Sequence, residues 1–160
     1  MTDKIVEVFR KLTNNMVFDQ QFADAKKEDL LIPAEKAAKK ISDLVKSNRK
    51  GDSLFYSVAM IYELHCMKVE TFLVITSEGD ERMKATVGYI NDGKLLTADP
   101  TAVIKGKKGE YINIPLNTML EHYQIALLYD IFAEETSNLI FMDQKRGGFL
   151  GEPIEMFVRE

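Results

Sequence analysis

Residues 51–59 read GDSLFYSVA and open the most apolar helix that the sequence predicts. Asp52 and Ser53 are both residues that favour the N-cap of a helix, and the next residues are mostly apolar as far as about Met67. The apolar positions cover more than half of the helix circumference, which is typical of a helix that is buried on several sides. The sequence therefore predicts a central helix that begins at Ser53 and lies inside the domain.

Helices are also predicted before this segment. Apolar residues from Ile5 to Leu12 recur at helical spacing, and Asn14-Asn15 ends that pattern. Residues 16–32 are mixed and predict a loop with a short helix. Pro33 then occupies a first-turn position before a second amphipathic helix that ends in Asn48 to Gly51.

Strands are predicted after the central helix. Residues 69–76 are rich in β-branched and aromatic residues, which predicts a strand. Strands are also predicted over 83–90 and 94–100, and Asn91-Asp92-Gly93 between these two apolar segments predicts a hairpin. Leu116, Leu120, Tyr123, Leu127 and Ile131 fit one face of a long helix over 116–135. Residues 139–142 and 154–158 predict short strands around a glycine-rich turn at 145–151. This order predicts one α+β domain over 1–160, in which the central helix packs on a mainly antiparallel sheet, with N-terminal helices and one long C-terminal helix.

Net charge, apolar runs and residue counts limit the classes of partner and cofactor that we expect. The 160 residues carry a net charge of −4, so we expect no nucleic-acid partner. No apolar run approaches the roughly 20 residues that span a bilayer, and the first residues predict a helix rather than a leader peptide, so we expect a cytoplasmic chain without a membrane partner. One cysteine and two histidines argue against a zinc site of the Cys/His type, and the sequence has no spaced acidic loop of the EF-hand kind, so we expect no metal and no cofactor.

Three segments carry a family resemblance: GDSLFYSVAMIYEL (51–64), KATVGYINDGKLL (84–96) and ADPT (98–101). Over about residues 45–102 the chain resembles the transglutaminase-like branch of the papain-like fold. In that family a cysteine opens the central helix, the first hairpin strand brings a histidine, and the next strand ends in Asp-Pro. The resemblance implies a papain-like core, and it places Ser53 at the cysteine position, Lys84 at the histidine position and Asp99 at the aspartate position.

The substitutions remove the chemistry of the family. A thiolate beside an imidazole is a strong nucleophile, whereas a serine needs a general base poised near neutral pH. Lysine is a base only when it is neutral, and a neighbouring Asp99 favours the charged ammonium. The sequence therefore predicts a Lys84–Asp99 ion pair and a degenerate site that lacks the Cys–His pair. Simple structural roles compete with these readings, because Ser53 is also an N-cap and Asp99 before Pro100 also opens a turn.

Three functions stay open. The first is a non-catalytic protein that uses the cleft between the central helix and the hairpin to bind a peptide, a protein or a small ligand. The second is a hydrolase or acyltransferase in which Ser53 is the nucleophile. The third is an unrelated α+β interaction protein, for instance a homo-oligomer joined through edge strands. Cys66 continues the apolar stripe of the central helix and is predicted to be buried, while His122 is predicted at a surface or boundary position.

Overall fold

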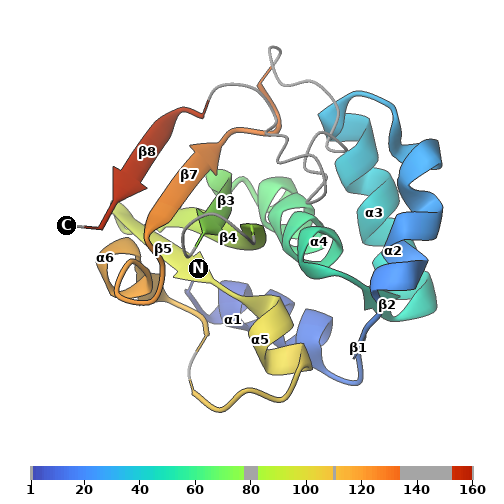
Figure 1. The fold of residues 1–160 in the computed structure, drawn as a ribbon, viewed down its shortest axis with the longest axis horizontal. Helices are drawn as coiled ribbons and strands as arrows, with labels where there is room; N and C mark the ends of the chain where they lie inside the picture. The colour runs from blue at the N-terminus through green and yellow to red at the C-terminus, as the bar shows by residue number, and fades with distance from the viewer. Residues whose placement is uncertain (1, 78–82, 110, 134–152, 160) are drawn as a thin grey trace.

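The computed structural model of the chain describes residues 2–77, 83–109, 111–133 and 153–159. These residues form an α+β fold (Figure 1). The elements in chain order are α1 (Thr2–Thr13), β1 (Val17–Phe18), α2 (Gln20–Lys26), the 3-10 helix η1 (Lys27–Leu30), α3 (Ala34–Asn48), β2 (Lys50–Gly51), α4 (Ser53–Cys66), β3 (Thr71–Ser77), β4 (Met83–Asn91), β5 (Lys94–Ala98), α5 (Pro100–Ile104), β6 (Ile114–Pro115), α6 (Leu116–Met119), β7 (Ile125–Tyr129) and β8 (Glu155–Val158).

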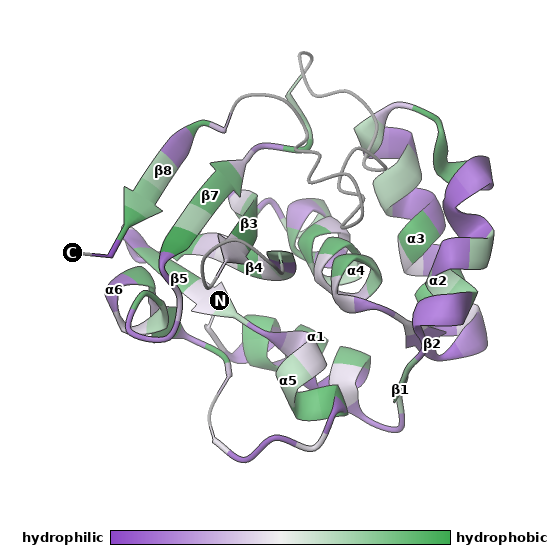
Figure 2. Ribbon diagram, viewed as in Figure 1, coloured by the Kyte–Doolittle hydropathy of each residue, from purple (hydrophilic) through white to green (hydrophobic). Residues whose placement is uncertain are grey.

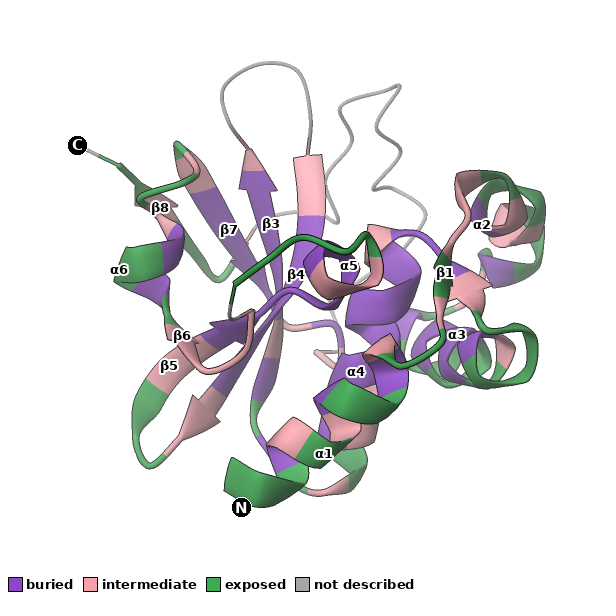
Figure 3. Ribbon diagram, turned by 90° about the horizontal axis from the view of Figure 1, so that it is seen from below, coloured by how far each residue is buried: buried purple, intermediate pink, exposed green. Residues whose placement is uncertain are grey.

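The main sheet separates two layers of helices. Its strand order is β6-β5-β4-β3-β7-β8, and every neighbouring pair is antiparallel. Figure 3 shows α6 on one side of this sheet and α4, with α1 and α3, on the other. The two faces of the sheet therefore line two different cores.

The helix α4 is the centre of the larger core. Phe55, Tyr56 and Met60 are among its nine buried residues, and α4 packs against α1, α3, α5, β3 and β4. Figure 2 shows the contrast with α3, on which hydrophobic and hydrophilic residues alternate. The prediction of a buried helix that begins at Ser53 and packs on an antiparallel sheet is confirmed.

The start of α4 is anchored by a second, two-stranded sheet. In it β1 runs parallel to β2, so that Phe18 pairs with Gly51. The hydroxyl of Tyr56 donates a hydrogen bond to the carbonyl oxygen of Val17 at 2.7 Å. A Cβ atom at Gly51 would lie 2.7 Å from the Cβ of Phe55, which is closer than real Cβ contacts. Glycine is therefore required at the first position of the GDSLFYSVA segment.

The hairpin prediction is also confirmed. The strands β4 and β5 pair from Asn91↔Lys94 to Val87↔Ala98. Asp92 and Gly93 form the turn with φ values of 51° and 74°. Positive φ at both central residues is the geometry of the tight turns that match the twist of two strands, and Asp-Gly favours it.

The predicted long helix over 116–135 is wrong. The chain forms only the short helix α6 there, and residues 125–129 form the strand β7 between β3 and β8. Ala126 and Leu128 contact the smaller core on the α6 side, whereas Leu127 and Tyr129 contact the larger core on the α4 side. A strand that is covered on both faces is apolar at every position, so its sequence also fits a helical stripe.

The structure also differs from the sequence predictions in smaller ways. The strand predicted over 94–100 ends at Ala98, because Asp99 caps the short helix α5 and Pro100 begins it. The region 16–32, predicted as a loop with a short helix, contains β1, α2 and η1. Cys66 is exposed rather than buried, because it is the last residue of α4. The strand at 154–158 is confirmed as β8, while the predictions for 139–142 and 145–151 lie outside the described residues.

Candidate functional site

The first turn of α4 meets the sheet where β5 has ended. The pairing of β4 with β5 stops at Val87↔Ala98, so no residue of β5 pairs with Ala85. Two serine hydroxyls take its place: the amide of Ala85 donates to Ser53 Oγ at 3.4 Å, and Ser57 Oγ donates to the carbonyl oxygen of Ala85 at 3.0 Å. Ser53 and Ser57 thus supply hydrogen-bond partners to the main chain of β4 at a position where β5 no longer pairs with it.

The N-cap of α4 is Asp52 and not Ser53. The Oδ1 atom of Asp52 accepts a hydrogen bond from the amide of Phe55 at 2.9 Å, and its Oδ2 atom accepts one from Gln20 at 3.0 Å. Burial raises the pKa of this carboxyl group above its usual 3.8, although both hydrogen bonds oppose the shift. The predicted capping role of Ser53 therefore belongs to its neighbour.

The structure joins Lys84 and Asp99 in an ion pair. The distance from Lys84 Nζ to Asp99 Oδ2 is 2.5 Å, and the two side chains are 22% and 8% exposed. The other carboxylate oxygen, Asp99 Oδ1, accepts a hydrogen bond from the amide of Ala102 at 3.2 Å and so caps α5. The two roles considered for Asp99, turn formation and pairing with Lys84, coexist in one side chain.

The side chains of Lys84 and Ala85, which are neighbours on β4, leave the strand on opposite faces of the sheet. Side chains alternate along a strand, and Ala85 and Val87 belong to the core around α4. On the other face of β4, Thr86 contacts Met119 of α6, and Lys84 lies on that same face. Ser53 and Ser57 instead bind the main chain of Ala85, at the edge of β4 that β5 leaves unpaired, while the Lys84 ammonium binds Asp99.

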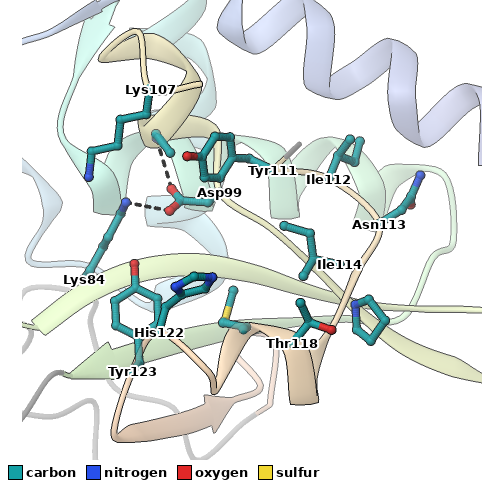
Figure 4. A pocket seen from close by; sticks show the side chains of 13 residues that line it. Lys84, Asp99, Lys107, Tyr111, Ile112, Asn113, Ile114, Thr118, His122 and Tyr123 are labelled. Atoms are coloured by element: carbon teal, nitrogen blue, oxygen red, sulfur yellow. Dashed lines mark hydrogen bonds and ion pairs between the residues drawn. The ribbon is translucent and has the colours of Figure 1, made fainter. Parts of the chain in front are cut away.

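A pocket of about 530 Å³ adjoins the ion pair (Figure 4). It lies between the ends of β4 and β5, the connection that follows α5, and α6 with its succeeding turn. Tyr111, Ile114 and Met119 contribute apolar surface. Lys84, Lys107 and His122 contribute nitrogen atoms, and Asp99 contributes the carboxylate. A volume of this size is within the range of small-molecule sites.

The charge of this pocket is opposite to that of the whole chain. Two lysines and one aspartate line it, in a protein of net charge −4. Asp99 is engaged by Lys84, whereas Lys107 is exposed and its ammonium has no ion pair among the described residues. In Figure 4 the Lys107 side chain reaches toward the ammonium of Lys84. The pocket therefore presents an uncompensated positive charge beside an apolar wall.

One wall of the pocket is held by a pair of hydrogen bonds. The hydroxyl of Tyr89 donates to Asn113 Oδ1 at 2.6 Å and accepts from the amide of Asn113 at 2.8 Å. Tyr89 is itself fully buried in the core, and burial raises its pKa to about 12. The segment that carries Tyr111 and Ile114 is thus tied to Tyr89 of β4.

Sequence reasoning did not point to this pocket. Lys107, Tyr111 and Met119 belong to a turn, a loop and a short helix, and no motif or spacing connects them with Lys84. His122 lies at the surface as predicted. One sequence prediction bears on the pocket: the ion pair of Lys84 with Asp99, which lies at one side of it.

The described residues 2–77, 83–109, 111–133 and 153–159 contain neither a candidate metal centre nor a candidate membrane span. No group of three or more His, Cys, Asp or Glu residues there could hold a metal ion. None of the helices in that part of the chain has the length and apolar character needed to cross a bilayer.

Comparison of the chain with protein-family models, with curated proteins and with solved structures gives no match.

Proposed function

We propose that the protein is a non-catalytic relative of the transglutaminase-like proteins that binds a small organic anion in the pocket beside Lys84, Asp99 and Lys107. The family part of this proposal rests on the order of the elements. A buried helix begins at Ser53, its first turn contacts β4, and the hairpin β4–β5 ends at Asp99-Pro100. This is the arrangement expected of a papain-like core in which serine and lysine replace the reactive cysteine and histidine.

The non-catalytic part rests on the surroundings of Ser53. Its hydroxyl accepts a hydrogen bond from the main chain, and the residue of β4 that it meets is Ala85, which supplies no base. The ammonium of the neighbouring Lys84 is held in an ion pair by Asp99. A serine-directed fluorophosphonate probe is expected to leave Ser53 unlabelled while it labels a control serine hydrolase, and stoichiometric labelling of Ser53 would refute this part.

The binding part rests on one observation. The ammonium of Lys107, which has no ion pair among the described residues, lies at a partly apolar pocket that also contains Lys84. A carboxylate or phosphate group can accept hydrogen bonds from two ammonium groups. Tyr111, Ile114 and Met119 would contact the apolar body of such a ligand. A neutral ligand of the same shape would gain the apolar contacts but not the hydrogen bonds from the two ammonium groups to an anionic group.

The test is a titration of ¹⁵N-labelled protein with benzoate and phenyl phosphate, and with benzyl alcohol as the uncharged comparison. We expect amide shifts around 107–123 for the two anions, with affinities of about millimolar for ligands this small. Lys107→Gln is expected to weaken anion binding several-fold, by about 1 kcal/mol. Lys108→Gln, in the same turn but outside the pocket, is the matched control.

Three outcomes would contradict the proposal. The anions could produce no shifts near the pocket, benzyl alcohol could bind as well as benzoate, or Lys108→Gln could weaken binding as much as Lys107→Gln. The last outcome would mean that the anions bind through the general charge of the turn rather than in the pocket.

A further inference from the structure

Among the described residues, no strand pairs with the outer edge of β8, the last strand of the main sheet, and β8 carries exposed apolar side chains. It pairs with β7 on one side and is the last strand of the sheet order among the described residues. Met156 and Val158 are 59% and 56% exposed, whereas Phe157 between them packs against the core on the α6 side. Edge strands in natural proteins are commonly protected by charges, bulges or covering elements, so two exposed apolar side chains here call for a partner.

The hydrogen-bonding groups of this edge point outward at the same two residues. The amide of Arg159 donates to the carbonyl oxygen of Gln124 at 2.8 Å, which extends the ladder of β8 with β7. Inward and outward groups alternate in an antiparallel ladder, so Phe157 and Glu155 also face β7. Met156 and Val158 therefore direct their main-chain N–H and C=O groups away from the sheet.

The sequence of the edge, EMFVR over 155–159, is complementary to itself when two copies run antiparallel. With the two-fold axis at Phe157, Met156 lies opposite Val158 of the second copy, and each such pair exchanges both of its hydrogen bonds. The same register places Glu155 opposite Arg159 of the second copy. A shift of two residues in either direction places Phe157 opposite one of these charges instead, so only the central register pairs them.

We propose that two copies of this chain associate through β8, antiparallel about Phe157, to form one continuous sheet. The same strand edge of each copy forms the interface and is complementary to itself, as a two-fold symmetric dimer requires. Two apolar Met156–Val158 pairs and two Glu155–Arg159 pairs hold it. This inference does not depend on the pocket or on the proposed anion.

The first test is sedimentation equilibrium of the full chain from about 1 µM to about 1 mM. The wild-type protein is expected to change from its 18.2 kDa monomer to a species of twice that mass. Met156→Lys places a charge within the apolar pairs and is expected to leave the protein monomeric over this range. A wild-type chain that stays monomeric throughout would leave this edge to another partner and would overturn the proposal.

Charge reversal tests the register. Glu155→Arg alone sets two arginines opposite each other at both ends of the strand pair, and Arg159→Glu alone sets two glutamates there. Each single variant is expected to dimerise roughly tenfold more weakly than the wild type. Mixing the two variants restores opposite charges in both pairs, so the mixture is expected to form the heterodimer with nearly wild-type affinity.

The controls are Glu7→Arg and Lys11→Glu, which reverse the same kinds of charge in an exposed pair on α1. They are expected to dimerise as the wild type does. Thermal melts of each variant show that the fold is retained, which matters because Arg159 also donates to the carbonyl oxygen of Glu121 at 3.0 Å. Failure of the mixture to regain affinity would overturn the antiparallel register about Phe157.

Discussion

The hydroxyl of Ser57 donates a hydrogen bond to the carbonyl oxygen of Ala85 at 3.0 Å, and both residues are completely buried or nearly so. One turn earlier on the same helix, Ser53 accepts from the amide of Ala85. Two side chains of α4 thereby take over the hydrogen bonds that β5 leaves unmade beyond Ala98. The segment GDSLFYSVA fixes the helix to the sheet through its serines as well as through its apolar residues.

Ser57→Ala is expected to destabilise the protein more than Ser53→Ala. The first change leaves a buried carbonyl without its partner, at a cost of about 1–3 kcal/mol. The second removes a longer, partly exposed hydrogen bond and is expected to cost about 0.5 kcal/mol. Urea unfolding of the two variants and the wild type measures both losses, and equal losses would contradict the assigned roles.

The ion pair of Lys84 and Asp99 is expected to show coupling in a double-mutant cycle. Lys84→Met leaves a buried carboxylate without its cation and is expected to cost about 1–3 kcal/mol. Asp99→Asn retains an oxygen for the α5 cap and removes the charge. The double variant is expected to lose less than the sum of the two single losses, by about 1 kcal/mol. Strict additivity would indicate that the pair contributes no interaction energy to the fold.

Asp52 makes a pH-dependent contribution to stability. Because burial raises its pKa in the folded protein above 3.8, folding favours the protonated form. The contribution is fully present below the unfolded pKa and is lost as the pH rises through the folded pKa. Asp52→Asn keeps a cap residue without the charge, so the stability of the wild type relative to this variant is expected to rise as the pH falls from 7 to about 4. Denaturation of both proteins across this range measures it, and a constant or falling difference would contradict the sign.

Gly51→Ala is expected to destabilise the fold by about 1–3 kcal/mol, because the new methyl group would overlap the Cβ of Phe55. The Cβ of Phe55 is fixed by the backbone of α4 and cannot swing aside. Gly106→Ala is the comparison: it meets open space, so only its φ of 75° opposes the substitution, at about 1 kcal/mol. Thermal and denaturant unfolding rank the two variants, and a larger loss at Gly106 would contradict the packing argument.

The parts of the fold that the sequence predicts are those whose signals are local. The helix from Ser53 follows from its caps and composition, and the β4–β5 hairpin follows from Asp92-Gly93, which takes up the required positive φ. The failure at 125–129 has a physical cause. The run IALLY lies between β3 and β8 in the sheet, and both of its faces are covered, so it is apolar at every position. Such a run lacks the alternation of apolar and polar residues that identifies a strand with one exposed face.

Most of the candidate site could not be predicted from the sequence, because its residues come together only in the three-dimensional fold. The pairing of Lys84 with Asp99 is a neighbour relation across one hairpin, so a register estimate was enough to predict it. The contact of Ser53 with the main chain of Ala85 depends on where β5 stops pairing with β4, which no local sequence pattern predicts. Lys107 and Tyr111 reach the pocket through a connection without a repeating pattern, so only the three-dimensional fold brings them to Lys84.

The hydroxyl of Tyr89, which both donates to and accepts from Asn113, has a consequence for how the pocket would act. A binding wall that is already ordered before a ligand arrives does not draw on the ligand's contacts to freeze it. Preorganisation of this kind lowers the entropic cost of recognition and favours ligands that fit the existing shape. The buried tyrosine of the central hairpin would in this way set the selectivity of a pocket that it does not line.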